Sequence, residues 1–141
     1  MSRGLGDVYK RQELIAKYNL QKRVYLKGVS NQIKEKLYRS SIFILPSLRE
    51  GFPLALCEAM SMGVPVVGCK SCSSVNSLIK DGENGFLCDD SAVSIAEALD
   101  KLISDYSLRK KLGQEAKSDM RQFSSESVLD KWEELLNSVV Q

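Results

Sequence analysis

Two carboxylates, Glu50 and Glu58, have the residue type and spacing best suited to chemistry on a ligand. Seven residues separate them, within residues 42–67, which read as strand, loop, helix and strand. Because the sequence neighbours of Glu58 are apolar, we predict that Glu58 is buried, and a lone buried carboxylate costs several kcal/mol unless it is paired. Two interpretations of Glu58 stay open, an ion pair with a nearby Lys or Arg, or a grip on two ligand hydroxyls.

The elements that would position these carboxylates form a βαβ unit. Residues 42–45 are an apolar run closed by Pro46, which indicates a strand. Pro53 suits the first turn of a helix that Gly63 stops, and residues 64–67 form a second buried strand. Two apolar strands joined by a short helix predict a right-handed crossover in a parallel sheet. Ligands of such sheets bind beyond the carboxyl ends of the strands, where residues 48–52 lie.

The segment 50–54 also suits an anion. Free backbone N–H groups and the positive end of the helix dipole meet at a helix start, and both favour a group such as phosphate. Gly51 has no side chain, so an anion can approach the backbone closely there.

At this point the residues resemble a family. The run Pro46-Ser-Leu-Arg-Glu-Gly-Phe-Pro-Leu-Ala-Leu-Cys-Glu-Ala-Met-Ser-Met-Gly-Val-Pro-Val-Val resembles the donor-site signature of retaining glycosyltransferases of the fourth sequence family, including its E-x7-E pair. Asp81-Gly-Glu-Asn-Gly-Phe-Leu also matches, and the similarity spans about residues 24–136. The resemblance implies the donor-binding, C-terminal half of an enzyme with the GT-B fold, which has two Rossmann-like domains.

The resemblance also implies roles for single residues. Glu50, the implied catalytic residue, would hold the donor sugar hydroxyls, and Glu58 would grip the ribose diol. The turn at Gly28 would line the nucleotide base, although on spacing alone it is an ordinary tight turn. The residues implied to bind the donor are Gly28, Val29, Gly51, Phe52, Pro53, Leu54 and Glu58.

The implied reaction moves a sugar from a nucleotide-sugar to an acceptor hydroxyl with retained configuration, without a cofactor or a required metal. The implied setting is surface polysaccharide or glycolipid synthesis, in the cytoplasm or at the inner face of the membrane, with peripheral membrane association of the full-length protein. The implied partners are the nucleotide-sugar donor and an N-terminal acceptor-binding domain missing from this chain. We therefore expect this fragment alone to bind a donor weakly and to turn over nothing.

One segment departs from the family pattern. Where the family commonly has two glycines and, after two more residues, a glutamate, this chain has Ser73-Ser74-Val75-Asn76-Ser77. The altered loop would face the donor sugar or the acceptor, so the sugar identity does not carry over.

Composition bounds the chain to one soluble globular domain. The βαβ pattern and the resemblance imply that its fold class is α/β, a Rossmann-like, doubly wound parallel sheet with C-terminal helices. The chain has 141 residues, 43% of them hydrophobic and 27% charged, and no run approaches the roughly 20 apolar residues of a membrane span. Residues 7–12 are the translation of a sequencing-library transposon end, GATGTGTATAAGAGACAG. We therefore expect residues 1–12 to be a disordered adapter artefact and residues 13–141 to form a truncated nucleotide-sugar-binding domain.

The net charge gives no sign of nucleic-acid binding. The whole chain has 20 basic and 18 acidic residues, and residues 1–12 hold three of the basic residues and one of the acidic residues. Without residues 1–12, the chain has 17 of each, so no surplus of basic residues points to nucleic acid.

The flanking elements follow from periodicity. Residues 13–20 read as the tail of a helix, residues 24–26 as a strand, and Asn31 as the cap of the next helix. Ser94 and Glu97 suit a capping box for the first of three C-terminal helices. Trp132 belongs to an apolar stripe of the last helix, which we expect to pack against the sheet or against a missing domain.

The remaining chemistry is limited. Cys69 and Cys72 have zinc-ligand spacing, but Cys57 and Cys88 lie far from them in sequence and the chain has no His, so we favour reduced, packed thiols over a zinc or redox site. The lack of His also excludes histidine-based triads within the chain. The alternative class is a non-catalytic subunit that keeps the fold and binds a partner; an epimerase is weaker, because no further acid and base residues are found.

Overall fold

The structure is a computed structural model that describes residues 5–139. The chain forms two compact units, Met1–Asn31 and Gln32–Gln141, and each is described by itself. The first unit contains helix α1 (Leu5–Lys17), a turn with Asn19 in the left-handed conformation, and an irregular segment that reaches Gly28.

Two expectations for the first unit are wrong. Residues 5–12 are helical rather than disordered. They contain no proline and extend the helical segment 13–17, and adding residues to a nucleated helix costs little free energy. Residues 1–4 lie outside the described residues. Residues 24–26 form no strand, and Val24, Tyr25 and Leu26 are exposed. A strand needs ladder hydrogen bonds to a neighbour, and this segment belongs to the unit without the sheet.

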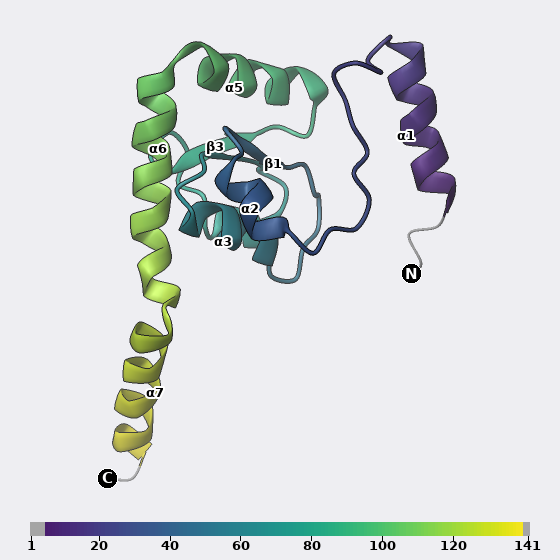
Figure 1. The fold of residues 1–141 in the computed structure, drawn as a ribbon. Coiled ribbons are helices and arrows are strands. Elements are labelled where there is room, and N and C mark those ends of the chain that lie inside the picture. Colours follow the sequence, from purple (N-terminus) through teal and green to yellow (C-terminus); the bar gives the residue numbers. More distant parts are fainter. Residues whose placement is uncertain (1–4, 140–141) are drawn as a thin grey trace. The chain divides into compact units, whose positions relative to one another are not determined.

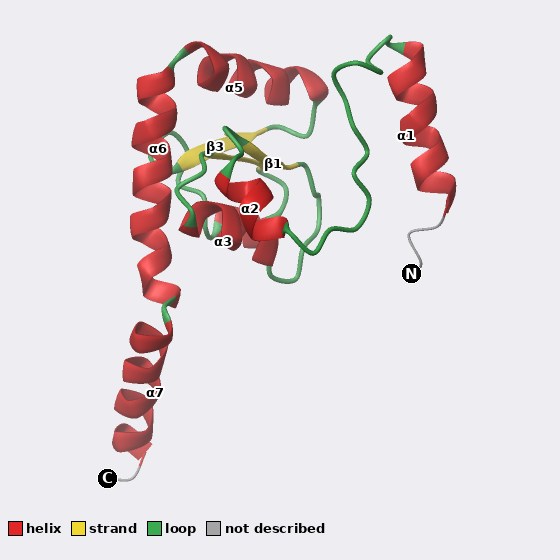
Figure 2. Ribbon diagram, in the orientation of Figure 1, coloured by secondary structure: helices red, strands yellow, loops and turns green. Residues whose placement is uncertain are grey.

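The second unit is built on a parallel three-stranded sheet in the order β1-β2-β3. Its strands are the yellow elements in Figure 2. The strands are β1 (Phe43–Leu45), β2 (Val66–Cys69) and β3 (Gly85–Cys88). Phe43 pairs with Val66, and Val66 pairs with Gly85. All four residues of β2 are buried, as expected for the central strand of a parallel sheet covered on both faces. The predicted α/β fold class with a parallel sheet is confirmed.

Helices cover both faces of this sheet (Figure 1). Val66 packs in a core cluster with residues of α2, α3 and α4, whereas the next residue, Val67, packs on the opposite face with α5. Helix α6 closes both sides, since Ala116 joins the first cluster and Leu112 the second. The helices are α2 (Ile33–Tyr38), α3 (Leu54–Ser61), α4 (Ser73–Asn76), α5 (Ala92–Ser104), α6 (Tyr106–Asp119), the 3₁₀ helix η1 (Met120–Phe123) and α7 (Ser125–Val139).

The predicted β1-α3-β2 unit is confirmed. Helix α3 begins directly after Pro53 and ends before Gly63, whose φ of 75° lies in the left-handed region that favours glycine. The crossover connects two parallel strands that are neighbours in the sheet. The carboxyl end of β1 therefore leads directly into the loop that carries Glu50.

One prediction for the C-terminal helices is wrong, and one alternative of a second prediction is excluded. Helix α5 is capped by Ser91, whose Oγ accepts a hydrogen bond from the N–H of Ser94 at 3.1 Å, so the helix starts one turn earlier than a capping box at Ser94 would allow. Helix α7 has no buried residue, and Trp132 is 58% exposed, so its stripe does not pack on the sheet. The other alternative, packing against a missing domain, stays a prediction. Within residues 5–139, no helix has both the length and the apolar character needed to cross a membrane.

Two glycines let α6 approach the end of α3. A Cβ atom added at the buried Gly113 would overlap the backbone carbonyl of Gly63. In an exposed helix, Gly→Ala stabilises by roughly 1 kcal/mol. Here the clash should make the substitution destabilising instead. We expect Gly113→Ala to lower the free energy of unfolding by about 1–3 kcal/mol, measured by urea denaturation. The exposed Gln114→Ala is the matched control, and a stabilised Gly113→Ala variant would contradict the close packing.

A polar network joins α6 to the turn before β3. The fully buried Asn84 donates to Asp119 Oδ2 at 2.7 Å, and Lys80 Nζ lies 3.1 Å from Asp119 Oδ1. Burial alone would raise the pKa of Asp119, but the hydrogen bonds from Asn84 and Lys80 outweigh it and hold this pKa below its ordinary value.

Because the native pKa of Asp119 is lowered, its ionised form stabilises the fold above the ordinary aspartate pKa, and this contribution is lost as the pH falls through the native pKa. We expect Asp119→Asn to be less stable than the unsubstituted chain by about 1–3 kcal/mol at neutral pH, with the difference shrinking towards about pH 3. Urea denaturation at several pH values measures this. Asp130→Asn, on exposed α7, should show no such trend.

Candidate functional site

The carboxyl ends of the three parallel strands bring three loops to one edge of the sheet. The loop after β1 leads through Glu50 to α3, the loop after β2 leads through Ser71 to α4, and the loop after β3 leads through Asp89 to α5. Sequence separation hides this proximity, because Glu50 and Asp89 are far apart along the chain. The edge is the candidate site.

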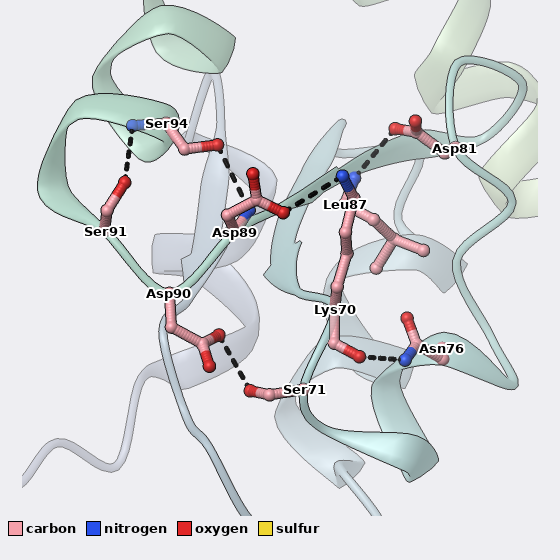
Figure 3. Close-up of polar contacts among 9 residues, drawn as sticks. All are labelled: Lys70, Ser71, Asn76, Asp81, Leu87, Asp89, Asp90, Ser91 and Ser94. Carbon is pink, nitrogen blue, oxygen red and sulfur yellow. Dashed lines mark hydrogen bonds and ion pairs between the residues drawn. The ribbon is translucent and has the colours of Figure 1, made fainter.

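The loops after β2 and β3 are joined by polar contacts (Figure 3). Lys70 Nζ pairs with Asp89 Oδ1 at 3.2 Å, and Ser71 Oγ donates to Asp90 Oδ1 at 2.7 Å. The Lys70 carbonyl also accepts a hydrogen bond from Asn76 of α4. An exposed ion pair alone contributes little, but the two contacts between the loops fix their spacing, and the bond from Asn76 holds the loop after β2 to α4.

The loop after β1 meets the neighbouring segments at two points. Ser74 Oγ of α4 donates to the carbonyl oxygen of Glu50 at 2.9 Å. Phe52 meets Phe123 of η1 edge to face, with ring centroids 6.1 Å apart. The sequence alone places Ser74 in the altered segment that would face the donor sugar or the acceptor, but it does not pair Ser74 with Glu50 and gives Phe123 no role. Only the strand order and the end of α6 bring these residues to Glu50 and Phe52.

The start of α3 leaves backbone donors available. The N-cap residue is Pro53, and no side chain caps the helix. Within residues 5–139, the N–H groups of Gly51, Phe52 and Ala55 have no protein acceptor. Unpaired N–H groups at a helix start are the feature that suits an anion, so this part of the prediction has the geometry that it needs.

Glu58 is exposed, so the expectation that it is buried is wrong. The buried residues Leu56, Ala59 and Met60 lie on the core side of α3, whereas Glu58 lines a pocket of about 620 Å³. The pocket walls combine apolar and basic side chains from four elements. Its lining residues are Lys34, Phe52, Leu54, Cys57, Glu58, Ser61, Met62, Lys117, Met120, Arg121, Phe123 and Ser124.

Neither carboxylate is neutralised. In the part of the chain that the structure describes, no Lys or Arg lies within 4.0 Å of Glu50 or Glu58 in an ion pair. The ion-pair interpretation of Glu58 therefore has no support. Glu50 is half-buried and does not line the pocket of Glu58, so the structure does not bring the two carboxylates into one cavity.

Other predicted residues lie elsewhere. Gly28 and Val29 belong to the first unit, where Gly28 has a φ of 63° and Val29 is fully exposed, so their contact with a base stays a prediction. Cys69, Cys72 and Cys88 are buried free thiols, and burial is the main cause that raises the pKa of Cys69 and Cys88. Among residues 5–139, no three His, Cys, Asp or Glu side chains are grouped as metal ligands.

The comparison with known families agrees with this geometry. The family model described as glycosyl transferases group 1 matches residues 4–119, which is most of the chain. The chain belongs to the glycosyl transferases group 1 family. The family match includes the whole β1-α3-β2 unit and both carboxylates.

Individual similarities support the same assignment. An exopolysaccharide phosphotransferase of Streptomyces coelicolor is 35% identical over 131 residues, which are 92% of this chain and 14% of that protein. The crystal structure of the C-terminal domain of a glycosyl transferase group 1 family protein (LpcC) from Francisella tularensis is similar with a TM-score of 0.74 and 29% identity, covering 86% of this chain and 64% of that one.

A further structure is relevant to ligands. A mutant of S. aureus TarM, crystallised in complex with Fondaparinux, alpha-GlcNAc-glycerol and UDP, is similar with a TM-score of 0.80 and 28% identity, covering 91% of this chain and 26% of that one. The fold is thus that of the C-terminal domain of a GT-B glycosyltransferase, as predicted. This chain spans 14% of the length of the curated Streptomyces relative.

An exposed carboxylate without an ion-pair partner should matter little for folding. We expect Glu58→Gln to change the free energy of unfolding by less than about 0.5 kcal/mol, measured by urea denaturation. Asn84→Ala, which removes a buried hydrogen-bonded side chain, is the destabilising reference. A loss above about 2 kcal/mol in Glu58→Gln would instead indicate a structural ion pair.

Proposed function

We propose that this chain is the donor-binding part of a retaining glycosyltransferase that moves a sugar from a nucleotide-sugar to an acceptor hydroxyl, without a metal. Glu50 holds the donor sugar, Glu58 the ribose diol, and the backbone from Gly51 to Leu54 the sugar and the phosphates. Membership of the glycosyl transferases group 1 family supports the reaction class. The named complex of TarM with UDP supports a nucleotide donor.

The observation that carries the proposal is the state of the groups around α3. The helix start has N–H groups without a described acceptor, and both carboxylates are free of ion pairs within the described residues. Groups that stabilise a fold are normally paired with one another. Unpaired donors and acceptors at the carboxyl edge of a parallel sheet suit a ligand that carries both phosphates and hydroxyls.

The chemistry follows from charge. When the bond between the sugar and the diphosphate breaks, negative charge develops on the leaving diphosphate. The N–H groups and the dipole at the start of α3 are fixed in advance, so they stabilise this charge without reorganising. A carboxylate such as Glu58 accepts hydrogen bonds from two neighbouring hydroxyls, which distinguishes ribose from deoxyribose.

The acceptor side of the reaction requires a further domain. We propose that an N-terminal domain binds the acceptor and that the full-length protein works in the cytoplasm at the inner face of the membrane, in surface polysaccharide or glycolipid synthesis. The name of the Streptomyces relative, an exopolysaccharide phosphotransferase, fits a polysaccharide setting.

Calorimetric titration of this chain with UDP-glucose, GDP-mannose and ADP-glucose tests donor binding. We expect one donor to bind weakly and Glu58→Ala to weaken it about tenfold or more, because hydrogen bonds to a charged group are lost. Glu115→Ala, which removes an exposed carboxylate of α6 outside the pocket, is the matched control.

Two other outcomes would overturn parts of the proposal. Equal affinity of the Glu58→Ala and unsubstituted chains would favour a non-catalytic subunit that binds a partner instead. Sugar transfer by the isolated chain, followed with radiolabelled donor and acceptor, would contradict the need for a second domain.

A further inference from the structure

One hydroxyl group connects the Glu50 loop to the next strand-end segment. Ser74 Oγ donates to the Glu50 carbonyl oxygen at 2.9 Å, although the two residues are 24 positions apart. The carbonyl carbon and the side chain of Glu50 are attached to the same Cα atom. A hydrogen bond that fixes the Glu50 peptide plane therefore restricts the directions in which the carboxylate can point.

Ser74 is itself held firmly. Its Oγ lies 3.5 Å from the buried Cys72 Sγ, and because the single proton of the Ser74 hydroxyl goes to Glu50, the thiol is the donor in that contact. The Ser77 hydroxyl donates to the Ser74 carbonyl at 2.8 Å. The next residue, Val75, is fully buried in the core. The hydroxyl thus projects from a helical turn fixed on both sides.

The anchor of Ser74 extends across the sheet edge. The segment after β2 is joined to the segment after β3 through Lys70–Asp89 and Ser71–Asp90, as Figure 3 shows. In the loop after β1, Gly51 has open space around its Cα, and Phe52 forms the ring pair with Phe123. The Ser74 hydroxyl is therefore a polar link between the segment after β2 and Glu50.

We propose that Ser74 is a positioning residue that aims the Glu50 carboxylate at the donor sugar. The inference rests on the proposed function, in which Glu50 contacts that sugar. It assigns a role to the Ser73–Ser77 segment, where this chain departs from the family pattern. Ser74 acts through Glu50 and does not itself need to touch the donor.

The first test needs no ligand. Hydrogen–deuterium exchange of peptides that contain residues 49–52 reports how firmly the loop is held. We expect these amides to exchange several-fold faster in Ser74→Ala. Ser74→Thr, which keeps the hydroxyl, should exchange as slowly as the unsubstituted chain. Ser107→Ala, which changes an exposed serine of α6, should have no effect. Unchanged exchange in Ser74→Ala would overturn the tether.

The second test separates positioning from general stability. The affinity for the donor that binds in the titration above is compared with the affinity for its nucleoside diphosphate, which lacks the sugar. We expect Ser74→Ala to weaken donor binding about three- to tenfold, in the range of one hydrogen bond, and to leave diphosphate binding unchanged. In a Glu50→Gln background the same substitution should have no further effect, because Ser74 acts through Glu50.

The outcomes distinguish the two proposals. Equal losses for donor and diphosphate, or a full additional loss in the Glu50→Gln background, would overturn the positioning role while the donor site stands. If the unsubstituted chain binds none of the three donors, the proposed function fails, and the positioning role fails with it. The exchange experiment still decides whether Ser74 holds the loop.

Discussion

The parallel pairing of β2 with both of its neighbours is the constraint on which the site depends. Because β1 and β3 run in the same direction as β2, each strand must end at the same edge, and each connection must return across a face of the sheet. Helix α3 covers one face and α5 the other, and β2 is buried between them. The edge collects three loops that no local interaction would bring together.

Helix α3 has a buried face that packs on the sheet and a face that lines a pocket. Leu56, Ala59 and Met60 are fully buried and hold the helix on the sheet, while Glu58 stands in an exposed pocket wall. Burying the carboxylate would require a paired charge to offset its desolvation. The exposed position of Glu58 avoids that cost.

The parts predicted correctly from sequence are those specified by local patterns. The apolar run of β1, the helix stop at Gly63 and the buried β2 each have their own signal within a few residues. Glu58 was misjudged because its sequence neighbours are apolar, but residues adjacent in a helix point in different directions. Residues 24–26 have a strand composition, yet a strand exists only with a partner, which composition does not supply. Ser91 and Ser94 are both acceptable caps, and the choice depends on where β3 ends.

The contacts that link the loops were beyond sequence reasoning for a different reason. Ser74 and Glu50, Lys70 and Asp89, and Phe52 and Phe123 are pairs of common residues whose types carry no signal of their partners. They become informative once the strand order is fixed. A binding edge in this architecture consequently has two layers: groups left unpaired at the start of α3, and paired groups behind them that hold their geometry. The same sequence segment can contribute to both, since the Glu50 carbonyl is bonded to the protein while its carboxylate forms no ion pair within residues 5–139.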